Sequence, residues 1–574
     1  MSEPAAQQAG GLRETTRAFE DRARQIRSGG GPKAIDRQHA KGRLTARERV
    51  IKLLDPPDKP AAIDAHADAI PGFFELGLWS AEGMYTEHGG APAAGVVTGI
   101  GRIRGRPHMV IANDATVKAG AFFPMTCKKI IRAQHVARMA RLPLVYLVDS
   151  AGVYLPLQED VFPDADDFGR IFYLNSIISA AGIPQTAAIM GNCVAGGGYL
   201  PVLCDTLLMT EGSGLYLAGP ALVKAAIGQE VSDEELGGAS MHSAISGTID
   251  FKEPDDEACI FRVRELIAKQ HARAPRHRET PAPRPVRAGE DVFDIFTDKP
   301  GTQYDVRDIL ACVVDARAEP DGDHETLAPD IDEYKPEYGP SLVCAYARIG
   351  GHPVGVVANQ GKLTERVQPG GKAGPSKAAG MPRVIYDDAA DKAARFIMDC
   401  NQRKIPLVFT HDTTGFMVGR DSEQAGIIRS GAKMVNAMSN SVVPKIVLIT
   451  GGSYGAGNYA MCGRAFEPFI TLAWPGTRCA VMGAAQASGT LAMIEERSRA
   501  RKGEEIDKAT HDAILDAVRA SYDEQQDIRH GAARGWLDRI IDPADTRDEL
   551  IAVLDAALAG WDLDAEFKTG VLQV

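Results

Sequence analysis

The chain reads Asn192-Cys193-Val194-Ala195-Gly196-Gly197-Gly198-Tyr199 at one place and Ser453-Tyr454-Gly455-Ala456-Gly457-Asn458-Tyr459 about 260 residues later. Each glycine-rich stretch follows an apolar run that is typical of a buried strand. An aspartate precedes each stretch by about 45 residues, in a turn after another strand-like run: Asp149 in the first case and Asp412 in the second. The repeated pattern indicates two similar domains, each with a backbone turn suited to an oxyanion.

Further segments repeat along the chain. Segments 143–146 and 184–190 match 406–409 and 444–449 with an offset near 260 residues, and 107–113 matches 353–359 with a slightly shorter one. An offset shared by several elements indicates an internal duplication, and 574 residues are too many for one hydrophobic core. Strand-like runs alternate with helical stretches, which predicts an α/β architecture.

The boundary between the repeats is predicted from composition. Residues 272–290 are rich in proline and arginine and show no apolar periodicity, which favours an interdomain linker. We therefore expect an N-terminal extension over residues 1–30, a first domain over 31–288 and a second domain over 289–574.

Charged helices are expected near the N-terminus. Residues 12–27 read as a helix, and Thr45 with Glu48 forms a capping box that marks the start of another. The arginines beside this box, Arg47 and Arg49 among them, are expected on a solvated or docking face.

Composition limits the classes of partner. The net charge of −12 argues against general affinity for nucleic acid or anionic membranes. Residues 171–204 lack charged side chains, but prolines, glycines and amides interrupt them. This run is expected to form buried core (a helix end, a strand, a turn and another helix) and no membrane span. Residues 1–5 lack the layout of a secretory signal, and we expect a cytoplasmic protein.

Several common active-site chemistries lack their motifs. Nine scattered cysteines form no C-x-x-C pair, so no metal site is expected and the cysteines, including Cys193 and Cys462, are predicted to be core residues. A phosphate-binding G-x-x-x-x-G-K-[ST] loop, a G-x-S-x-G elbow and an H-E-x-x-H motif are all missing from the sequence. Lys433 stands in a segment only superficially similar to a biotin attachment site and is predicted to be an ordinary helix residue.

The glycine turns themselves suggest a chemistry. Glycine lets a backbone approach a ligand closely, and a turn that opens a helix presents N–H groups and the positive end of the helix dipole. Two such N–H groups form an oxyanion hole, suited to the enolate of a thioester. Tight packing of helix against strand is the structural alternative for each turn taken alone.

Long segments of the chain also carry a resemblance to a known family. They include Arg37-Gln38-His39-Ala40-Lys41-Gly42-Arg43-Leu44-Thr45-Ala46-Arg47-Glu48-Arg49, Ala112-Asn113-Asp114-Ala115-Thr116-Val117-Lys118, Val161-Phe162-Pro163-Asp164, Phe168-Gly169-Arg170-Ile171-Phe172, Gly237-Gly238 with His242, Thr414-Gly415-Phe416-Met417-Val418-Gly419-Arg420 and Gly455-Ala456-Gly457-Asn458-Tyr459. From about residue 30 to 560, the chain resembles the carboxyltransferase (β) subunit of biotin-dependent acyl-CoA carboxylases, especially the 3-methylcrotonyl-CoA and geranyl-CoA carboxylase branch.

The resemblance implies a fold, a reaction and partners. It implies two duplicated domains of the ClpP/crotonase superfamily with spiral β-sheet cores, and a homo-oligomer, usually a hexamer. The expected partner is a biotin carboxylase and biotin carrier (α) subunit, which carries the biotin and uses ATP and bicarbonate. In such enzymes the N-terminal half binds acyl-CoA, the C-terminal half binds carboxybiotin, and the two sites meet across a dimer interface.

The resemblance also assigns roles to residues. Gly196 and Gly197 would hold the thioester enolate, whereas Ala456 and Gly457 would hold the ureido oxygen of biotin. Lys118, Lys128, Lys129 and Arg132 would offer positive charge for the phosphates of CoA, although a solvated helix face remains an equal alternative for these four. The remaining residues expected to bind substrate or cofactor are Ala151, Gly152, Tyr154, Gly198, Gly415, Phe416, Gly455, Asn458 and Tyr459.

The chain departs from the branch pattern at several places. Ala485 stands where the branch usually has glutamate, and about 20 extra residues lie between Gly361 and Ala389. The turn after Asp149 reads Ser150-Ala151-Gly152-Val153-Tyr154, with a bulky tyrosine, whereas the branch commonly has two glycines and an asparagine there. Residues 86–92 are unusual as well. These departures leave the acyl group open between a methylcrotonyl-like one and a short saturated one such as propionyl.

Three alternatives to a carboxylase stay open. The first is the reverse chemistry, in a sodium-pumping decarboxylase similar to glutaconyl-CoA decarboxylase, which would need a membrane partner. The second is a non-catalytic paralogue that only assembles with active subunits. A crotonase-type hydratase, the third, is disfavoured because no pair of carboxylates sits on the turns.

Overall fold

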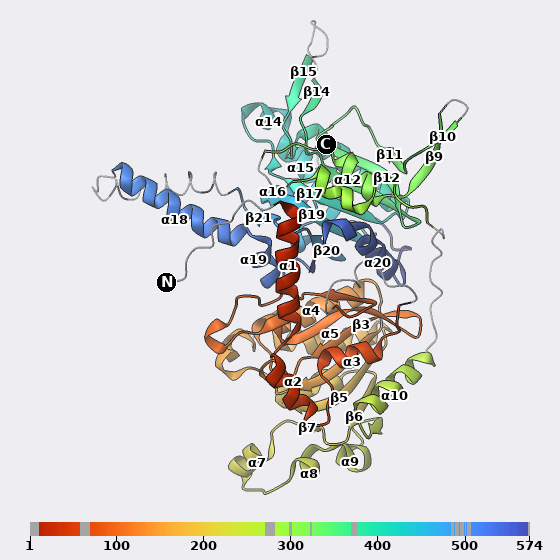
Figure 1. Cartoon of the computed structure of the whole chain (residues 1–574), viewed down its shortest axis with the longest axis vertical. Coiled ribbons are helices and arrows are strands. Elements are labelled where there is room, and N and C mark those ends of the chain that lie inside the picture. The colour runs from red at the N-terminus through yellow and green to blue at the C-terminus, as the bar shows by residue number, and fades with distance from the viewer. Residues whose placement is uncertain are drawn as a thin grey trace.

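The computed structural model describes residues 11–57, 69–162, 164–269, 282–297, 301–321, 324–368, 376–483 and 507–571, with single residues between 487 and 501. Ala485, most of the predicted linker and the tip of the extra segment after Gly361 lie outside these residues. The described part contains two eight-stranded sheets, one in each half of the chain (Figure 1).

The two sheets have the same strand order. The first runs β1-β2-β3-β4-β5-β6-β8 with β7 paired to β5, and the second runs β11-β12-β13-β17-β19-β20-β22 with β21 paired to β19. In each sheet the first three strands are antiparallel and the following ones are parallel. The strands are β1 (Phe73–Leu76), β2 (Val96–Ile103), β3 (Arg106–Asn113), β4 (Leu144–Ser150), β5 (Gln185–Val194), β6 (Thr206–Thr210), β7 (Gly214–Tyr216), β8 (Phe251–Glu253), β11 (Ile331–Glu333), β12 (Leu342–Ile349), β13 (His352–Asn359), β17 (Leu407–Thr413), β19 (Lys445–Tyr454), β20 (Ile470–Ala473), β21 (Arg478–Ala480) and β22 (Arg539–Ile540).

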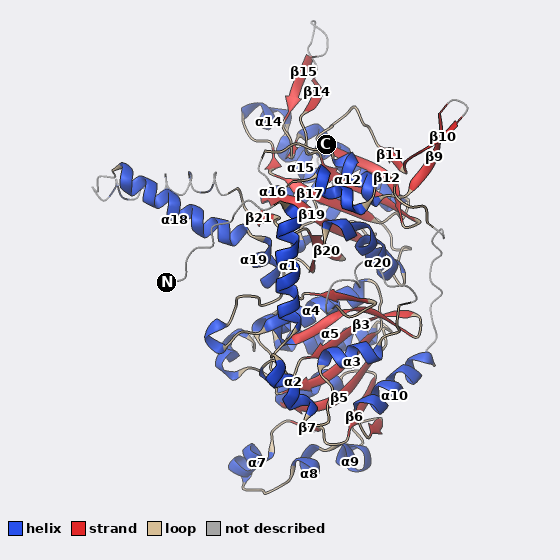
Figure 2. Cartoon of the chain, viewed as in Figure 1, coloured by secondary structure: helices blue, strands red, loops and turns tan. Residues whose placement is uncertain are grey.

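Helices flank each sheet, as Figure 2 shows. In the first half they are α1 (Leu12–Arg27), α2 (Pro32–His39), α3 (Ala46–Leu53), α4 (Pro124–Met139), α5 (Phe168–Ala180), α6 (Tyr199–Val202), α7 (Pro220–Ile227), α8 (Asp233–Gly237), α9 (Ala239–Met241) and α10 (Asp256–Ala268). In the second half they are α11 (Val292–Ile295), α12 (Val306–Val313), α13 (Asp387–Gln402), α14 (Arg420–Ala425), α15 (Ile427–Ser439), α16 (Gly455–Ala460), α18 (Lys508–Gln526), α19 (Ile528–Ala533) and α20 (Thr546–Leu558).

The sequence pattern explains which helices cover which face. Side chains alternate along a strand, so in β3 Met109 and Ile111 join one core, whereas Val110 and Ala112 join another. Residues of α4 and α5 pack into the first core, and residues of α3 and α10 pack into the second. Strands that are buried on both faces read as continuous apolar runs, and the sequence shows such runs.

One apolar core spans both halves of the chain. It contains Ile130 from α4, Val356 from β13 and Leu554 from α20. The helix α1 adds a second connection, because Phe19 and Ile26 pack in one cluster with Phe409 of β17. The two sheet domains therefore fold against each other.

Several predicted elements are confirmed. The helix over residues 12–27 and the Thr45–Glu48 capping box are both present. Residues 171–204 form the rest of α5, then β5, a turn and α6, and no helix of the described residues is long and apolar enough to cross a membrane. All nine cysteines are free, and Lys433 lies within α15, where it pairs with Asp391.

Candidate active site

The first glycine turn faces a second turn across a narrow gap. After β5 the chain forms a single 3₁₀ turn, Ala195–Gly198, which leads into α6. A Cβ atom placed on the buried Gly197 would lie 3.8 Å from Cα of Gly152, in the turn that follows β4. Gly152 has a left-handed φ of 85°, and its N–H donates to Oγ of Ser150 over 3.1 Å. Only backbone lines the gap at this point, which suits close approach of a ligand.

The second glycine turn has the same construction. Gly457 lies in α16, and a Cβ atom placed on it would lie 2.9 Å from Cα of Gly415, in the turn after β17. Gly415 has a φ of 114°, and its N–H donates to Oγ1 of Thr413 over 3.0 Å. The structure therefore brings Gly457 and Gly415 together as it brings Gly197 and Gly152 together. Gly455, two residues before Gly457, has a left-handed φ of 54°, and Ala456 is exposed.

A buried aspartate lies beneath each turn, at a matched irregularity of the sheet. The register between β4 and β5 shifts between Val148 and Ser150, and that between β17 and β19 shifts between His411 and Thr413. A Cβ atom on Gly191 would lie 2.1 Å from the carboxylate of Asp149. A Cβ atom on Gly451 would lie 2.3 Å from the carboxylate of Asp412, so both positions require glycine.

The backbone completes the match between the two aspartates. Asp149 accepts the N–H of Asn192 over 3.3 Å, and Asp412 accepts the N–H of Gly452 over 2.9 Å. Each carboxylate thus ties the end of one strand to the start of a glycine turn on the next strand.

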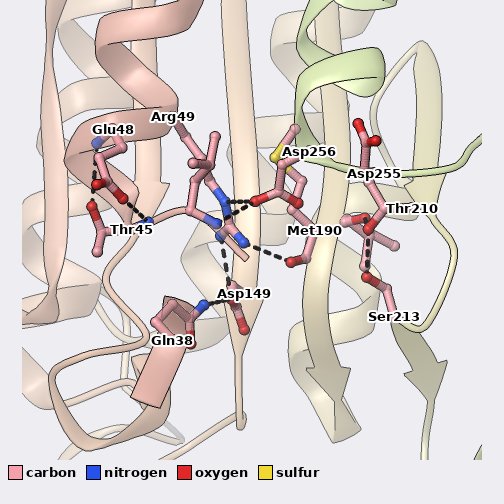
Figure 3. Close-up of polar contacts among 12 residues, drawn as sticks. Gln38, Thr45, Glu48, Arg49, Asp149, Met190, Thr210, Ser213, Asp255 and Asp256 are labelled. Carbon is pink, nitrogen blue, oxygen red and sulfur yellow. Dashed lines mark hydrogen bonds and ion pairs between the residues drawn. The ribbon is translucent and has the colours of Figure 1, made fainter. Parts of the chain in front are cut away.

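An arginine from α3 holds the first aspartate (Figure 3). Arg49 is only 1% exposed and donates to Asp149 (3.2 Å), Asp256 (2.8 Å) and the carbonyl of Met190 (2.7 Å). Gln38 donates to the same oxygen of Asp149 over 2.9 Å. The expectation of a solvated face is therefore wrong for Arg49, because two buried carboxylates need its charge. The sequence feature that could have indicated a buried partner for Arg49 is the aspartate at the end of an apolar strand.

Different elements hold the second aspartate. The hydroxyl of Tyr304 donates to Asp412 over 2.8 Å, and the guanidinium of Arg383 donates to the same oxygen. Burial and the charge of Asp412 raise the pKa of Tyr304 well above its usual range. Tyr304 and Arg383 were missed in the sequence because neither lies near the repeated motifs.

Aromatic side chains border the first turn. Tyr154 stacks on Phe123 with ring centroids 4.4 Å apart and an interplanar angle of 16°, and His88 meets its edge at 5.4 Å. The backbone of Phe122 joins the Gly152 turn, since its N–H donates to the carbonyl of Gly152 over 2.9 Å. Of these rings, Tyr154 lies on the loop that carries Gly152, and Phe123 and His88 pack against it from two other segments.

The four predicted cations divide into two pairs. Lys118 and Lys128 are exposed. Lys129 is buried and donates to the carbonyls of Ala93 (2.9 Å) and Val96 (2.6 Å), and burial lowers the pKa of its ammonium group to about 7. Arg132 pairs with a carboxylate of the second half. Lys129 and Arg132 therefore serve the fold and are not placed to meet CoA.

The other predicted residues surround the second turn. Asn458 donates to Oγ of Ser453 over 2.8 Å, and His411 bonds the same hydroxyl over 2.9 Å. Burial lowers the pKa of His411 to about 4, so this imidazole is neutral at physiological pH. Tyr459 is half exposed, and Phe416 packs over Gly431.

The cysteines near the turns are unreactive. Burial raises the pKa of the Cys193 and Cys462 thiols to about 12, which leaves both protonated. The described residues contain no group of histidine, cysteine and carboxylate side chains that could hold a metal ion. The site thus offers backbone turns and few reactive side chains.

Comparison with known proteins assigns the chain to a family. The profile of the carboxyl transferase domain family matches residues 37–561. The chain belongs to the carboxyl transferase family.

Two relatives and one solved structure illustrate this membership of the carboxyl transferase family. The chain is 42% identical over 523 residues to the biotin-dependent 3-methylcrotonyl-coenzyme A carboxylase β1 subunit of Mycobacterium tuberculosis, which covers 90% of this chain and 89% of that protein. It is 40% identical over 543 residues to the mitochondrial methylcrotonoyl-CoA carboxylase β chain of Arabidopsis thaliana (93% and 84% covered). The β subunit of P. aeruginosa geranyl-CoA carboxylase superposes with a TM-score of 0.79 at 31% identity, over 100% of this chain and 99% of that one.

These findings bear on the predictions as follows. The resemblance to the carboxyltransferase subunit and the α/β fold with two duplicated, crotonase-like sheet domains are confirmed. The domain boundaries after residues 30 and 288 and the roles of the turn residues stay predictions.

Proposed function

We propose that this chain is the carboxyltransferase subunit of a biotin-dependent acyl-CoA carboxylase. It moves a carboxyl group from carboxybiotin, carried by a partner subunit, to the α- or vinylogous carbon of an acyl-CoA. The observation that supports this most directly is the matched pair of turns, Gly197 on Gly152 and Gly457 on Gly415, in a member of the carboxyl transferase family. We call the Gly197–Gly152 pair the first cradle and the Gly457–Gly415 pair the second cradle. Two similar backbone sites suit a reaction in which two oxyanions are stabilised.

The first cradle is proposed to bind the thioester. Backbone N–H groups of Gly196 and Gly197 donate to the thioester oxygen, and they do so most strongly when it carries the negative charge of the enolate. Gly152 leaves room for the thioester because it has no side chain. Ala151 and Gly198 flank the turn, and we assign the phosphates of CoA to Lys118 and Lys128 because both are exposed cations.

The second cradle is proposed to bind the ureido group. N–H groups of Ala456 and Gly457 donate to the ureido oxygen, with Gly415, Phe416, Gly455 and Tyr459 around the ring. The residues present fit this planar group, because Ala456 is exposed and neither Gly415 nor Gly455 carries a side chain. When bound, carboxybiotin supplies the carboxyl group and afterwards a nitrogen able to take the substrate proton. The chain itself needs no general base, and the buried His411 supplies none.

The acyl group is proposed to be small. Tyr154, on the loop that carries Gly152, packs with Phe123 and His88 from two other segments into an aromatic cluster beside the first cradle. The relatives named above act on methylcrotonyl-CoA, and a cluster of this kind favours a methylcrotonyl-like or short acyl chain.

The assembly is proposed by analogy with the family. It consists of a β-subunit homo-oligomer, a hexamer, with a biotin carboxylase and biotin carrier α subunit that uses ATP and bicarbonate. A cytoplasmic location stays a prediction.

A labelled-bicarbonate assay tests this function. The native complex is purified through the full-length chain and blotted with streptavidin, and is then supplied with ATP, labelled bicarbonate and a panel of acyl-CoAs. We expect a biotinylated partner band and label in a short or methylcrotonyl-like acyl-CoA.

Other outcomes contradict the proposal in distinguishable ways. Sodium-dependent loss of CO₂ from a carboxylated acyl-CoA, without ATP-driven fixation, favours a decarboxylase. An intact, biotinylated complex that stays inactive until a second β subunit is added identifies a non-catalytic paralogue.

A further inference from the structure

The extra segment between Gly361 and Ala389 has two parts. The first is a hairpin of β14 (Thr364–Gln368) and β15 (Ser376–Gly380), which pair only with each other and project from the second half (Figure 1). The second is a return segment, residues 381–386, which leads from the hairpin into α13. Among the described residues of this stretch, those of the return segment contact the second turn of the candidate active site.

The return segment is a strand partner of the second turn. β16 (Val384–Ile385) pairs in parallel with β18 (Gly415–Phe416). The N–H of Thr414 donates to the carbonyl of Arg383 over 2.8 Å, and the N–H of Met417 donates to that of Ile385 over 2.9 Å. The Gly415 turn, which contacts Gly457, is thus held on one side by the return segment.

Arg383 fixes this contact with its side chain. Its guanidinium donates to Asp412, beneath the turn, and to the carbonyl of Thr302 over 2.6 Å, and lies 5.5 Å from the ring centre of Tyr304. Its backbone has a left-handed φ of 66°, which is unfavourable for a residue with a Cβ atom. Such a conformation persists only where several contacts enforce it.

The first half pairs its backbone in the same way, because Phe122 bridges Val153 in parallel, but the charge partner of its aspartate differs. There Asp149 receives its arginine from α3, through Arg49, and the two arginines lie in unrelated elements. The two aspartates therefore receive their positive charge from different elements, and that of the second half comes from the return segment.

We infer that the return segment is a built-in part of the biotin-side cradle, with Arg383 as its positioning residue. Arg383 holds Asp412 and the Thr413–Phe416 turn in place. The turn thereby keeps its position beside Gly457, where the ureido group is proposed to bind. The inference rests on the proposed function, because it takes the second cradle as the biotin site.

Steady-state kinetics of the full-length chain test the inference. The reverse half-reaction moves a carboxyl group from the carboxylated acyl-CoA to free biotin, so that the KM of each substrate is measured separately. We expect Arg383→Met to raise the KM for biotin about 10-fold or more and to leave the KM for the acyl-CoA within about twofold. Arg383→Lys, which keeps the charge, should recover part of the loss.

A matched control and a second readout accompany this assay. Arg366 lies in the hairpin, has a side chain 9% exposed against 18% for Arg383, and pairs with Asp387 and Asp388 in place of Asp412. Arg366→Met should leave both KM values unchanged. Arg383→Met leaves the buried Asp412 carboxylate without its arginine, which by itself destabilises the fold. The double variant Arg383→Met/Asp412→Asn removes this uncompensated charge. It should still show a raised KM for biotin and an unchanged KM for the acyl-CoA. Amide exchange in residues 413–417 should accelerate in the Arg383 variants alone.

The outcomes separate the two levels of the proposal. Unchanged KM for biotin and unchanged exchange in Arg383→Met would overturn the positioning role. A rise in the KM for acyl-CoA alone would overturn it as well and would reverse the assignment of the cradles. Wild-type protein that transfers nothing to biotin would sink the proposed function, while the exchange experiment would still decide whether Arg383 orders the turn.

Discussion

At the scale of single residues, a substitution of Gly197 distinguishes a role in folding from a role in catalysis. An alanine there meets no backbone closer than 3.8 Å, so the fold has room for the extra methyl group. The same methyl group narrows the gap toward Gly152 that the thioester is proposed to enter.

We therefore expect Gly197→Ala to retain the wild-type melting temperature and to lose about 10²-fold or more in kcat for carboxylation, as when an oxyanion donor is removed. Calorimetry and the labelled-bicarbonate assay check the two parts. The control is Gly169→Ala in α5, where an added Cβ atom has nothing within 4 Å. Full activity in Gly197→Ala would contradict the oxyanion role of the first turn.

At the scale of elements, one carboxylate joins two helices to an edge strand. Glu75 of β1 pairs with Arg47 of α3 at 2.7 Å and with Arg27 of α1 at 3.6 Å, and it is only 4% exposed. Arg539 of the second half donates to its carbonyl over 3.2 Å. Although burial alone would raise the pKa of the Glu75 carboxyl, the charge and hydrogen bonds of Arg47, with the charge of Arg27, lower it to about 2.

This pKa predicts a pH-dependent contribution to stability. The folded state binds the proton less readily than the unfolded state, so Glu75 stabilises fully above its unfolded pKa of about 4.5 and loses its effect as the pH falls toward 2. Glu75→Gln should lower the free energy of unfolding by about 3–5 kcal/mol at pH 7, because it removes the negative charge that faces two largely buried arginines. Urea unfolding should show the difference between variant and wild type shrinking between pH 4.5 and 2; a constant difference would refute the linkage.

At the scale of the whole molecule, a buried ion pair connects the two halves. Arg132 of α4 donates to both oxygens of Asp538 and to the carbonyls of Pro468 and Phe469. The Asp538 side chain is 2% exposed. Although burial alone would raise the pKa of Asp538, the charges of Arg132 and Arg464 lower it.

Removing this pair should weaken the coupling between the sheet domains. We expect Arg132→Met to cost about 3–5 kcal/mol, because it leaves a buried carboxylate short of charge, and to split a single thermal transition into two. Differential scanning calorimetry measures both effects. Lys224→Met breaks the exposed pair with Glu230 and should change stability by less than about 1 kcal/mol. Equal effects in both variants would argue against a coupling role for Arg132.

The sequence by itself determined the duplication, the α/β class, the strands that carry the turns and the family. Apolar runs, proline and glycine positions and the offset near 260 residues are local or periodic signals, and each is readable without a partner segment. The turns after β5 and β19 were found for the same reason, because a glycine-rich stretch that follows an apolar run is a local signal.

Tertiary structure alone decided which side chains support those turns. Arg49 reaches Asp149 across 100 positions of the sequence, and Tyr304 reaches Asp412 across 108. Arg383 reaches Asp412 only because the return segment pairs with β18. An ion pair or hydrogen bond between distant segments leaves no periodic trace, because its partner is set by the packing of whole elements. For that reason Lys129 and Arg132 read as possible ligand cations, although burial commits both to the fold.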